Sequence, residues 1–290
     1  MTIKIFNQEG LDFLGTIESN SVDLVLTDPP YITSRQTGMH KWAEHVKKQD
    51  LPGSIPAKSE QEWLDFIANP KNSLDKFFEN SNVVNRQNAI SRMKKDFLKY
   101  GSTYGKKYAV TTDYGDWDSQ FTLEIMNKFV EQFYRVLKKT GTAIVFFDMW
   151  KITNLKDILE GNKFKQLRFI EWIKTNPQPL NSSRNYLTNC REIALMGVKG
   201  GTPTFNSKYD NAIYNFPVQG GKNRFHPTQK SLPLFEELIR KHSNEGDLVL
   251  DPFLGAATTA EASKRTNRSF VGCEVDKDFY EKSIDRLAEV

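Results

Sequence analysis

The 290-residue chain predicts an α/β fold, in which helices cover a doubly wound, mainly parallel sheet. Apolar, strand-like segments alternate with amphipathic helical segments along most of the sequence. Two unusual turns, at 28–31 and 251–259, each follow directly on an apolar run and so mark the carboxyl end of a strand. Sheets of this class bind ligands at such ends, where the strand order reverses. We therefore expect the two turns to flank one cleft.

The first third of the chain divides into a strand–helix–strand unit and an insertion. Val22–Thr27 is largely apolar and is expected to be the second of two strands that enclose a short helix. Residues 34–112 form the insertion, which starts with a long loop. Ser59-Glu60-Gln61-Glu62 is a capping box and therefore opens a helix. Further helices are expected over 73–79 and 88–100.

The remaining two thirds complete the alternating pattern. Phe121–Lys138 is predicted to be a helix because its apolar residues recur at helical spacing. Thr142–Asp148 is predicted to be a buried strand, since every residue between its ends is apolar. Further strands are expected over Phe169–Lys174, Glu192–Val198, Val249–Asp251 and Ser269–Asp276, helices over Leu232–His242, capped by Ser231, and Ala260–Lys264, and a loop over Gly200–Asn223.

The first turn, Asp28-Pro29-Pro30-Tyr31, suits a specific chemical task. An exocyclic amine on a planar heterocycle is a poor nucleophile, because its lone pair is delocalised into the ring. Acceptors on both of its N–H bonds, the Asp28 carboxylate and a carbonyl of the proline segment, would favour a tetrahedral nitrogen. Prolines fix the turn and free carbonyls from ladder pairing. Tyr31 can stack on the face of the base.

The second turn has the pattern of a nucleotide-binding βαβ unit. Asp251-Pro252-Phe253-Leu254-Gly255 ends a strand, and a turn of small residues leads into a helix that runs through Ala260 to about Lys264. The next strand carries Glu274, 23 residues after Asp251. A carboxylate at this place can accept both hydroxyls of a ribose.

With these motifs the chain resembles the S-adenosylmethionine-dependent DNA amino-methyltransferases, in the permuted beta subgroup that has its catalytic motif first and its cofactor motif last. Three further segments carry the resemblance and arrive in the order of that subgroup. They are Gly115-Asp116-Trp117-Asp118 with the following Arg135–Gly141, Trp172–Pro177, and His226-Pro227-Thr228-Gln229-Lys230. Together the motifs span nearly the whole chain.

The resemblance implies a Rossmann-like methyltransferase fold, S-adenosylmethionine as cofactor and no metal. It implies that Asp28 orients the target amine, with Pro29, Pro30 and Tyr31 completing the catalytic motif. Lys174 and Asn176 are expected to line the pocket for the target base. The expected cofactor-binding residues are Asp251, Pro252, Phe253, Gly255, Thr258, Glu274, His226, Thr228 and Lys230.

One departure from the family pattern concerns Ala256-Ala257, where glycine is usual. An alanine cannot adopt a positive φ cheaply, and it adds a methyl group near the cofactor. The turn fits if that position is helical. Ser231 stands where the family usually has proline. Serine is suitable at this position because it is a good N-cap for the helix that follows.

Charge is unevenly distributed over a chain whose net charge is only +4. Two basic segments, one in the insertion and one at 181–230, are expected to contact the phosphates of DNA. The expected DNA-binding residues are Arg86, Arg92, Lys94, Lys95, Lys99, Lys106, Lys107, Lys208, Lys222 and Arg224. The predicted organisation is therefore a catalytic domain at 1–33, 113–198 and 226–290, a DNA-contacting insertion at 34–112, and a target-recognition segment at 199–225.

The sequence leaves several functions open. Adenine-N6 methylation of DNA is favoured because the tetrapeptide starts with Asp, whereas the cytosine-N4 enzymes of the subgroup more often start with Ser. The target base has to be flipped out of the duplex or be single-stranded already. More distant alternatives are methylation of RNA or of a glutamine side chain, and a non-catalytic DNA-binding module. A cognate restriction endonuclease and a second copy of the chain are candidate partners besides DNA.

Composition points to a cytoplasmic protein without membrane contact. The two cysteines, Cys190 and Cys273, provide no disulfide framework, which is typical of a reducing compartment. No apolar stretch approaches the roughly 18 residues of a membrane span. The N-terminal segment lacks the pattern of a signal peptide.

Overall fold

The computed structural model describes residues 1–31, 58–69, 72, 74, 78, 85–100, 103, 121–177, 187–220, 225–226 and 228–290. The chain divides into two compact units. One unit comprises Met1–Thr33 and Tyr114–Val290, and the other comprises Ser34–Asp113.

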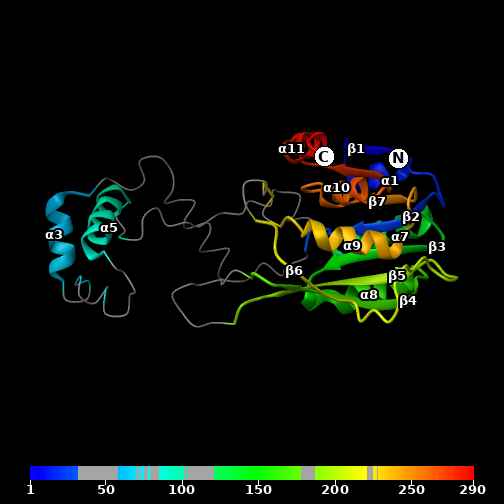
Figure 1. Cartoon of the computed structure of the whole chain (residues 1–290), viewed down its shortest axis with the longest axis horizontal. Coiled ribbons are helices and arrows are strands. Elements are labelled where there is room, and N and C mark those ends of the chain that lie inside the picture. Colours follow the sequence, from blue (N-terminus) through cyan, green and yellow to red (C-terminus); the bar gives the residue numbers. More distant parts are fainter. Residues whose placement is uncertain are drawn as a thin grey trace. The chain divides into compact units, whose positions relative to one another are not determined.

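The larger unit is built on an eight-stranded sheet with the order β1-β8-β7-β2-β3-β5-β4-β6 (Figure 1). All neighbouring strands are parallel except β5, which runs antiparallel to both β3 and β4. The predicted doubly wound, mainly parallel sheet is therefore confirmed. The strands are β1 (Ile3–Asn7), β2 (Val22–Thr27), β3 (Leu137–Phe147), β4 (Lys165–Lys174), β5 (Arg191–Val198), β6 (Ile213–Phe216), β7 (Leu248–Asp251) and β8 (Ser269–Glu274).

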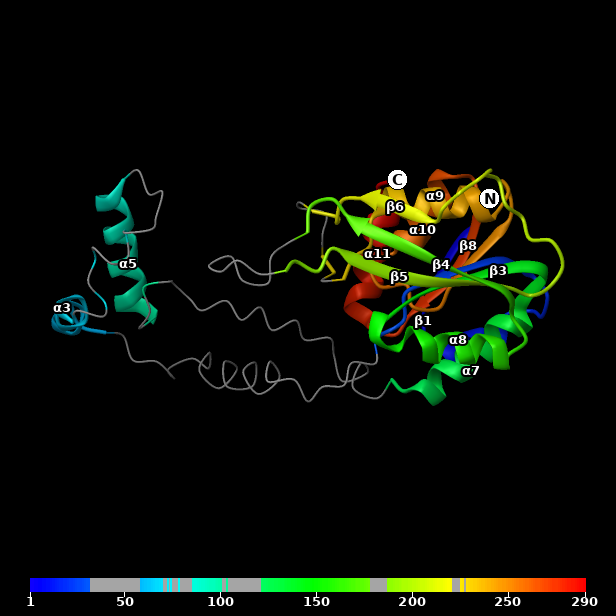
Figure 2. The same cartoon turned by 90° about the horizontal axis from the view of Figure 1, so that it is seen from below.

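Helices cover both faces of this sheet, as Figure 2 shows. Alternate residues of the buried strands serve the two layers, since successive side chains of a strand point to opposite faces. Val25 and Val145 pack with α1, α7 and α8, whereas Leu24 and Ile144 pack with α9 and α10. The helices are α1 (Gly10–Thr16), α7 (Leu123–Val136), α8 (Ile152–Gly161), α9 (Leu232–His242), α10 (Thr258–Arg265) and α11 (Lys277–Ala288), and a short 3-10 helix, η2, spans Met149–Lys151. None of the described helices is long and apolar enough to cross a membrane.

The strand order reverses between β2 and β7. These strands are far apart in sequence but pair side by side, with Leu24 opposite Val249 and Val25 opposite Leu250. The chain continues from β7 to β8 on one side and from β2 to β3 on the other. The turns that follow β2 and β7 therefore lie next to each other at the carboxyl edge of the sheet, as the sequence predicted.

Two predictions about local structure are wrong. Helix α7 ends at Val136, and β3 begins at Leu137, so the predicted helix is too long and the predicted strand starts too late. Leu137 is fully buried and pairs with Val22, and this tertiary pairing overrides the helical periodicity. The predicted loop 200–223 contains β6, whose four residues bury only Tyr214. An edge strand this short has too little alternation to be recognised.

Helix starts are set by side-chain caps in most of the described cases. In the Ser59 capping box the hydroxyl accepts from the Glu62 N–H, and the Glu62 carboxylate accepts from the Ser59 N–H, as predicted. Ser231 does stand at the N-cap of α9, but its side chain makes no capping hydrogen bond. A proline in the first turn of α9 reduces the number of N–H groups that need a partner.

The smaller unit contains α3 (Glu60–Ala68) and α5 (Arg86–Tyr100), and the latter confirms the helix predicted over 88–100. An aromatic cluster joins the two helices. The ring of Phe97 lies 5.5 Å from that of Trp63 and 4.7 Å from that of Phe66. Most of the helix predicted over 73–79 lies outside the described residues.

Gly272 lies in β8 against Asp251, where the backbones of two strands approach closely. A Cβ added there would overlap the Asp251 carbonyl oxygen and lie 2.6 Å from the Phe270 ring. We expect Gly272→Ala to lower the free energy of unfolding by about 1–3 kcal/mol in chemical denaturation. Gly161→Ala is the matched control, because an added Cβ meets nothing within 4 Å. A Gly272→Ala variant as stable as this control would contradict the packing described.

Candidate active site

A pocket that is open to solvent at its mouth lies where the sheet order reverses. It is formed by the ends of β2 and β7, the start of α10 and the segment before α9. Its lining residues are Asp28, His226, Thr228, Gln229, Lys230, Phe235, Asp251, Phe253, Leu254, Gly255, Ala256, Thr258 and Thr259. Asp28 and Asp251 thus flank one pocket, as the sequence predicted.

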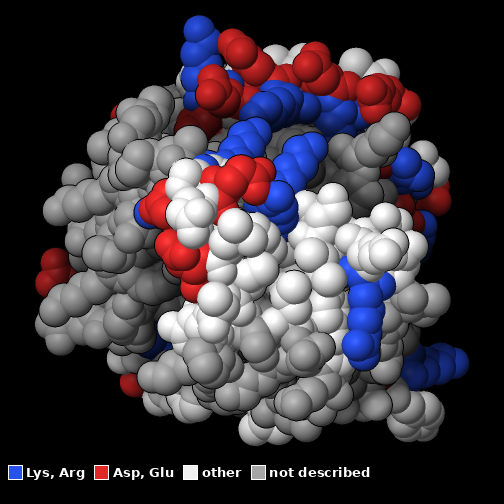
Figure 3. Space-filling view, turned by 90° about the vertical axis from the view of Figure 1, so that its left-hand side faces the viewer, with Lys and Arg blue, Asp and Glu red and all other residues white. Residues whose placement is uncertain are grey.

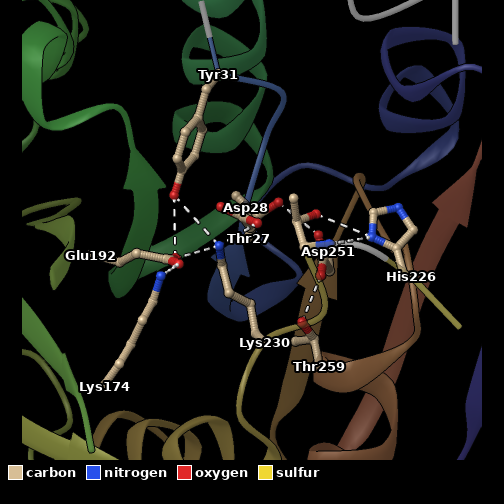
Figure 4. Close-up of polar contacts among 10 residues, drawn as sticks. Thr27, Asp28, Tyr31, Lys174, Glu192, His226, Lys230, Asp251 and Thr259 are labelled. Carbon is tan, nitrogen blue, oxygen red and sulfur yellow. Dashed lines mark hydrogen bonds and ion pairs between the residues drawn. The ribbon is translucent and has the colours of Figure 1, made fainter. Parts of the chain in front are cut away.

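Asp251 ties the two strands and the following helix together. Its buried carboxylate accepts hydrogen bonds from the hydroxyls of Thr27 and Thr259, both at 2.6 Å (Figure 4). It also accepts from the Phe253 N–H at 3.0 Å. Burial outweighs these donors and raises the pKa of Asp251 to about 6. The Thr27 bond fixes the residue just before Asp28 relative to the turn after β7.

The turn after β7 needs two left-handed residues. Gly255 has φ +52° and Ala257 has φ +59°, so Ala257 is not helical, and an alanine adopts the conformation that suits glycine. Two side chains of α11 hold the turn, because Ser283 donates to the Gly255 carbonyl at 3.0 Å and Arg286 donates to the Ala256 carbonyl. The sequence correctly identified the strained position, but it could not show that α11 supports it.

Glu274 lies at the end of β8, beside the turn. Its two carboxylate oxygens accept from the Gly255 N–H at 2.7 Å and the Asp276 N–H at 3.0 Å. Burial raises the pKa of Glu274 against the effect of these bonds. In this structure the carboxylate therefore shapes the turn, and its part in ribose binding stays a prediction.

The segment before α9 brings a histidine and a lysine to the pocket. The His226 ring packs 4.4 Å from that of Phe279, and its Nδ1 lies 3.1 Å from the Thr228 hydroxyl. Pro227 lies outside the described residues. Lys230 contacts the catalytic tetrapeptide, since its Nζ lies 2.7 Å from Asp28 Oδ2, and its part in cofactor binding stays a prediction.

The two carboxylate oxygens of Asp28 differ. Oδ2 pairs with Lys230, whereas Oδ1 is buried and has no hydrogen-bond partner among the described residues. Burial raises the pKa of Asp28, and the ammonium group of Lys230 opposes that effect. Buried polar atoms are normally satisfied, so an unpartnered carboxylate oxygen at a pocket marks a place for a donor from outside the protein.

Glu192 completes a network that the sequence did not reveal. It accepts from Lys174 at Oε1 and from Lys230 at Oε2, both at 2.6 Å (Figure 4). The Tyr31 hydroxyl lies 3.5 Å from Glu192 Oε2 and 3.4 Å from Lys230 Nζ. Burial opposes ionisation of Glu192, but the two lysines together hold its pKa below the usual value.

Lys174 and Asn176 both lie at the end of β4, but their side chains contact different parts of the protein. Lys174 joins the network through Glu192. The amide oxygen of Asn176 accepts from the Val218 N–H at 2.7 Å, which fastens the chain that follows β6. Thr27, Thr259 and Glu192 make polar contacts in the site that the sequence did not predict, and Gln229, Phe235, Leu254 and Ala256 are further lining residues that it did not predict.

Some of the predicted DNA-binding residues contact other residues of the protein, some are exposed, and some lie outside the described residues. On α5, Lys94 pairs with Glu60 at 2.6 Å, Arg92 lies 4.0 Å from Asp96, and Arg86 lies over the Phe78 ring. Lys95 and Lys99 are exposed on the same helix. Lys106, Lys107, Lys222 and Arg224 lie outside the described residues. On the described part of the face in Figure 3, basic side chains are interspersed with acidic ones.

Lys208 lies at the wrong edge of the sheet for contact beside the pocket. Because β5 is antiparallel, it ends at the amino edge of the parallel strands, and the chain after it starts there. Asn206 donates to the carbonyls of Arg240 and Ser243, at the far end of α9. An 11-residue helix, about 16 Å long, separates this segment from Lys230. Within the described part of 199–225, the chain after β6, 217–220, is therefore the part that lies at the carboxyl edge of the sheet.

Comparison with known proteins identifies the family to which this site belongs. A family model described as DNA methylase, of the N6/N4 methyltransferase type, matches residues 22–285. The chain belongs to this family. The match includes both turns and all the pocket residues named above. Among the described residues of this DNA methylase, no group of three or more His, Cys, Asp or Glu side chains is arranged to hold a metal ion.

Curated relatives include two type II methyltransferases. M2.DpnII of Streptococcus pneumoniae is 32% identical over 203 residues, which are 61% of this DNA methylase and 73% of that protein. M.HpaI of Haemophilus parainfluenzae is 33% identical over 207 residues, which are 63% of this chain and 64% of that protein.

Solved structures share the fold over the whole chain. The M1.HpyAVI–SAM complex has a TM-score of 0.59 and 22% identity, and the alignment covers 99% of each chain. The PvuII DNA methyltransferase, described as cytosine-N4-specific, has a TM-score of 0.63 and 14% identity, and the alignment covers 99% of this chain and 86% of that one.

The Asp251 bonds predict a pH-dependent stability effect. Folding raises the pKa of this carboxyl from 3.8 to about 6, so it contributes stability that is fully present below pH 3.8 and lost as the pH rises through 6. At pH 8 the Thr27 hydroxyl donates to a charged group, and Thr27→Val is expected to lower the free energy of unfolding by about 1.5–3 kcal/mol. At pH 5 the carboxyl is mostly protonated, and the loss should be about 0.5–1.5 kcal/mol.

Denaturant titrations at the two pH values measure this difference. Thr16→Val is the control, since the Thr16 hydroxyl donates to the neutral Phe13 carbonyl. Its effect on stability should not vary with pH. Equal losses for Thr27→Val at both pH values would contradict the assigned role of Asp251.

Proposed function

We propose that this DNA methylase transfers a methyl group from S-adenosylmethionine to the N6 amine of adenine in DNA. The observation that carries the proposal is Asp28 Oδ1, which has no hydrogen-bond partner in the described part of the chain and is buried at the same pocket as the turn 251–257. One acceptor for an amine and one turn of the nucleotide-binding type meet where the sheet order reverses.

The pocket residues fit the proposed cofactor. The Gly255 turn and the start of α10 form one wall, on which an added Cβ at Gly255 would lie 3.9 Å from His226. Phe253 and Leu254 supply apolar surface for an adenine ring, and Glu274 stands at the end of β8, where a ribose would be held. When bound, S-adenosylmethionine supplies a methyl group already activated by its sulfonium sulfur.

The protein's own part in the reaction is to orient the amine and to take up a proton. Asp28 Oδ1 accepts one N–H of the amine, and a carbonyl of the Pro29-Pro30 segment accepts the other. The nitrogen lone pair is then directed at the methyl carbon. As the N–C bond forms and the S–C bond breaks, the nitrogen acquires a positive charge, and Asp28 Oδ1 accepts its surplus proton. The raised pKa of Asp28 suits it to this acceptance.

The target base reaches this pocket only outside the double helix. We infer that the adenine is flipped, with Tyr31 stacked on its face. The hydroxyl of Tyr31 lies close to Lys230 and Glu192, which keeps the ring in place. Cytosine, which has its own exocyclic amine beside a ring nitrogen, would make the same contacts with Asp28. Adenine is preferred because the tetrapeptide starts with Asp.

DNA contacts are assigned to two parts of the chain. The smaller unit, 34–113, carries the basic face of α5, and the segment 217–225 follows β6, whose last residue lies at the carboxyl edge of the sheet. The relatives are named as type II methyltransferases, so a cognate endonuclease is the proposed partner, and two copies of the chain are the proposed assembly.

Asp28→Ala should abolish methyl transfer and leave cofactor binding largely intact, because the residue contacts the amine rather than the cofactor. The measurement is transfer of labelled methyl to DNA, with cofactor affinity from calorimetry and the modified nucleoside identified by mass spectrometry. Asp23→Asn, at the other end of β2, is the matched control, since Asp23 pairs with Lys138. Near-normal turnover in Asp28→Ala would refute the assigned role, and N4-methylcytosine as product would establish the alternative base.

Replacing Lys94, Lys95 and Lys99 by Gln should weaken DNA binding and flatten its salt dependence. Three lost phosphate contacts would reduce the slope of log K against log salt by up to about 3. Lys94 pairs with Glu60, so part of its charge is already balanced within the protein. The control replaces Lys139, Lys163 and Lys165, which are exposed near the amino ends of β3 and β4. An unaltered slope in the first variant would show that the α5 lysines are a solvated face.

A further inference from the structure

Glu192 lies at the catalytic edge of the sheet because of the direction of its strand. Strand β5 is antiparallel to both of its neighbours, so its first residues, not its last, reach the edge where β2 and β4 end. The Glu192 side chain is 19% exposed, and it lies between two ammonium groups. It is not among the residues that line the pocket.

We propose that Glu192 is a positioning residue for methyl transfer, which holds Lys230 so that this lysine occupies one oxygen of Asp28 and leaves the other for the amine of the target base. The inference rests on the proposed function of Asp28. It assigns to Glu192 an action through Lys230 and not a contact with the base or the cofactor.

The hydrogen bonds of Lys230 support this assignment. An ammonium group has three N–H donors. Three acceptors surround Lys230 Nζ: Glu192 Oε2 at 2.6 Å, Asp28 Oδ2 at 2.7 Å and the Tyr31 hydroxyl at 3.4 Å. The group is therefore saturated by protein acceptors, and its position is set from three sides. This leaves no donor of Lys230 for a bound cofactor.

The charge of Glu192 keeps Lys230 from pairing with both carboxylate oxygens of Asp28. Two carboxylates, Asp28 and Glu192, face two ammonium groups, Lys174 and Lys230, and all four side chains are less than one fifth exposed. Without the Glu192 charge, both lysines would have only the carboxylate of Asp28 nearby. Lys230 would then be drawn across both Asp28 oxygens, because a buried cation without its counter-charge is costly. Oδ1 would lose the freedom to accept from the amine.

If Glu192 served only to hold β5 in the sheet, its loss would lower the stability of the fold. Strands β4 and β5 are joined by seven paired positions, and β3 and β5 by six, so the sheet does not depend on one side chain to keep β5 in place. Loss of Glu192 should therefore change the state of Asp28 more than the fold. The groups that face Asp28 are Lys230 and Glu192 on one side, Tyr31 from its own turn, and Asp251 from β7.

The test compares Glu192→Gln with Glu171→Gln in the full chain. Glu171 is the matched control, because it lies on the neighbouring strand β4 and pairs with Arg191 at 3.3 Å, outside the network. Single-turnover methyl transfer is measured at saturating DNA and S-adenosylmethionine across pH 5–9, with cofactor affinity from calorimetry. We expect Glu192→Gln to reduce the rate about 10- to 100-fold, with cofactor affinity within about twofold of the original.

The pH profile separates positioning from a general loss of structure. The negative charge of Glu192 raises the pKa of Asp28, so its removal should move the acid limb of the profile to lower pH. Glu192→Asp keeps the charge but shortens the reach, so its acid limb should stay in place while its rate falls at least about threefold. This second variant carries the test if Glu192→Gln does not fold.

Three results would overturn the inference: an unchanged rate in both Glu192 variants, an acid limb that does not move in Glu192→Gln, or a fall in rate matched by an equal fall in cofactor affinity. Failure of the proposed function is distinguishable, because the unaltered chain would then transfer no methyl group to DNA.

Discussion

The hydrogen bond between Thr27 and Asp251 is the interaction on which the site depends. It joins the ends of two strands that are more than two hundred residues apart in sequence. Asp28 follows Thr27 directly, and the turn that cradles the pocket follows Asp251. One hydroxyl–carboxylate bond thus sets the distance between the group that would hold the amine and the turn that would hold the cofactor. Methyl transfer is sensitive to such distances, since orientation supplies much of its rate.

The second constraint is electrostatic. Four charged side chains from four different segments balance one another beside Tyr31, and each satisfies part of another's hydrogen-bonding capacity. Buried ion pairs of this kind contribute little net stability, because desolvation offsets their attraction. Their presence beside Asp28 is better explained by geometry: they fix which oxygen of Asp28 is occupied and which is not.

Most of the fold could be predicted from the sequence because its signals are local. The buried strands are recognisable from apolar runs, α7 from helical spacing, and α3 from its capping box. Strand β6 and the early start of β3 could not be predicted, because tertiary pairing with β4 and β2 creates them. The two turns were recognisable because their residue types match their chemistry.

The network around Asp28 could not be predicted from the sequence, because its contacts join residues that are far apart along the chain. Glu192 looks like any acid at the start of a strand, and only the antiparallel direction of β5 brings it to the site. Lys230 was placed with the cofactor because of its neighbours in sequence, whereas its contacts are with Asp28 and Glu192. Lys208 shows the reverse case: it is near the site in sequence, but the chain around it lies at the opposite edge of the sheet, and its contact with DNA stays a prediction.

The support of the turn by α11 has a consequence for shortened forms of the chain. Ser283 and Arg286 donate to the carbonyls of Gly255 and Ala256, and Ala257 next to them is held left-handed at an energetic cost of about 1 kcal/mol. A form that ended before α11 would retain every residue that lines the pocket. It would nevertheless lose the clamp that keeps this turn in its strained shape, so the last helix belongs to the smallest fragment with an intact pocket.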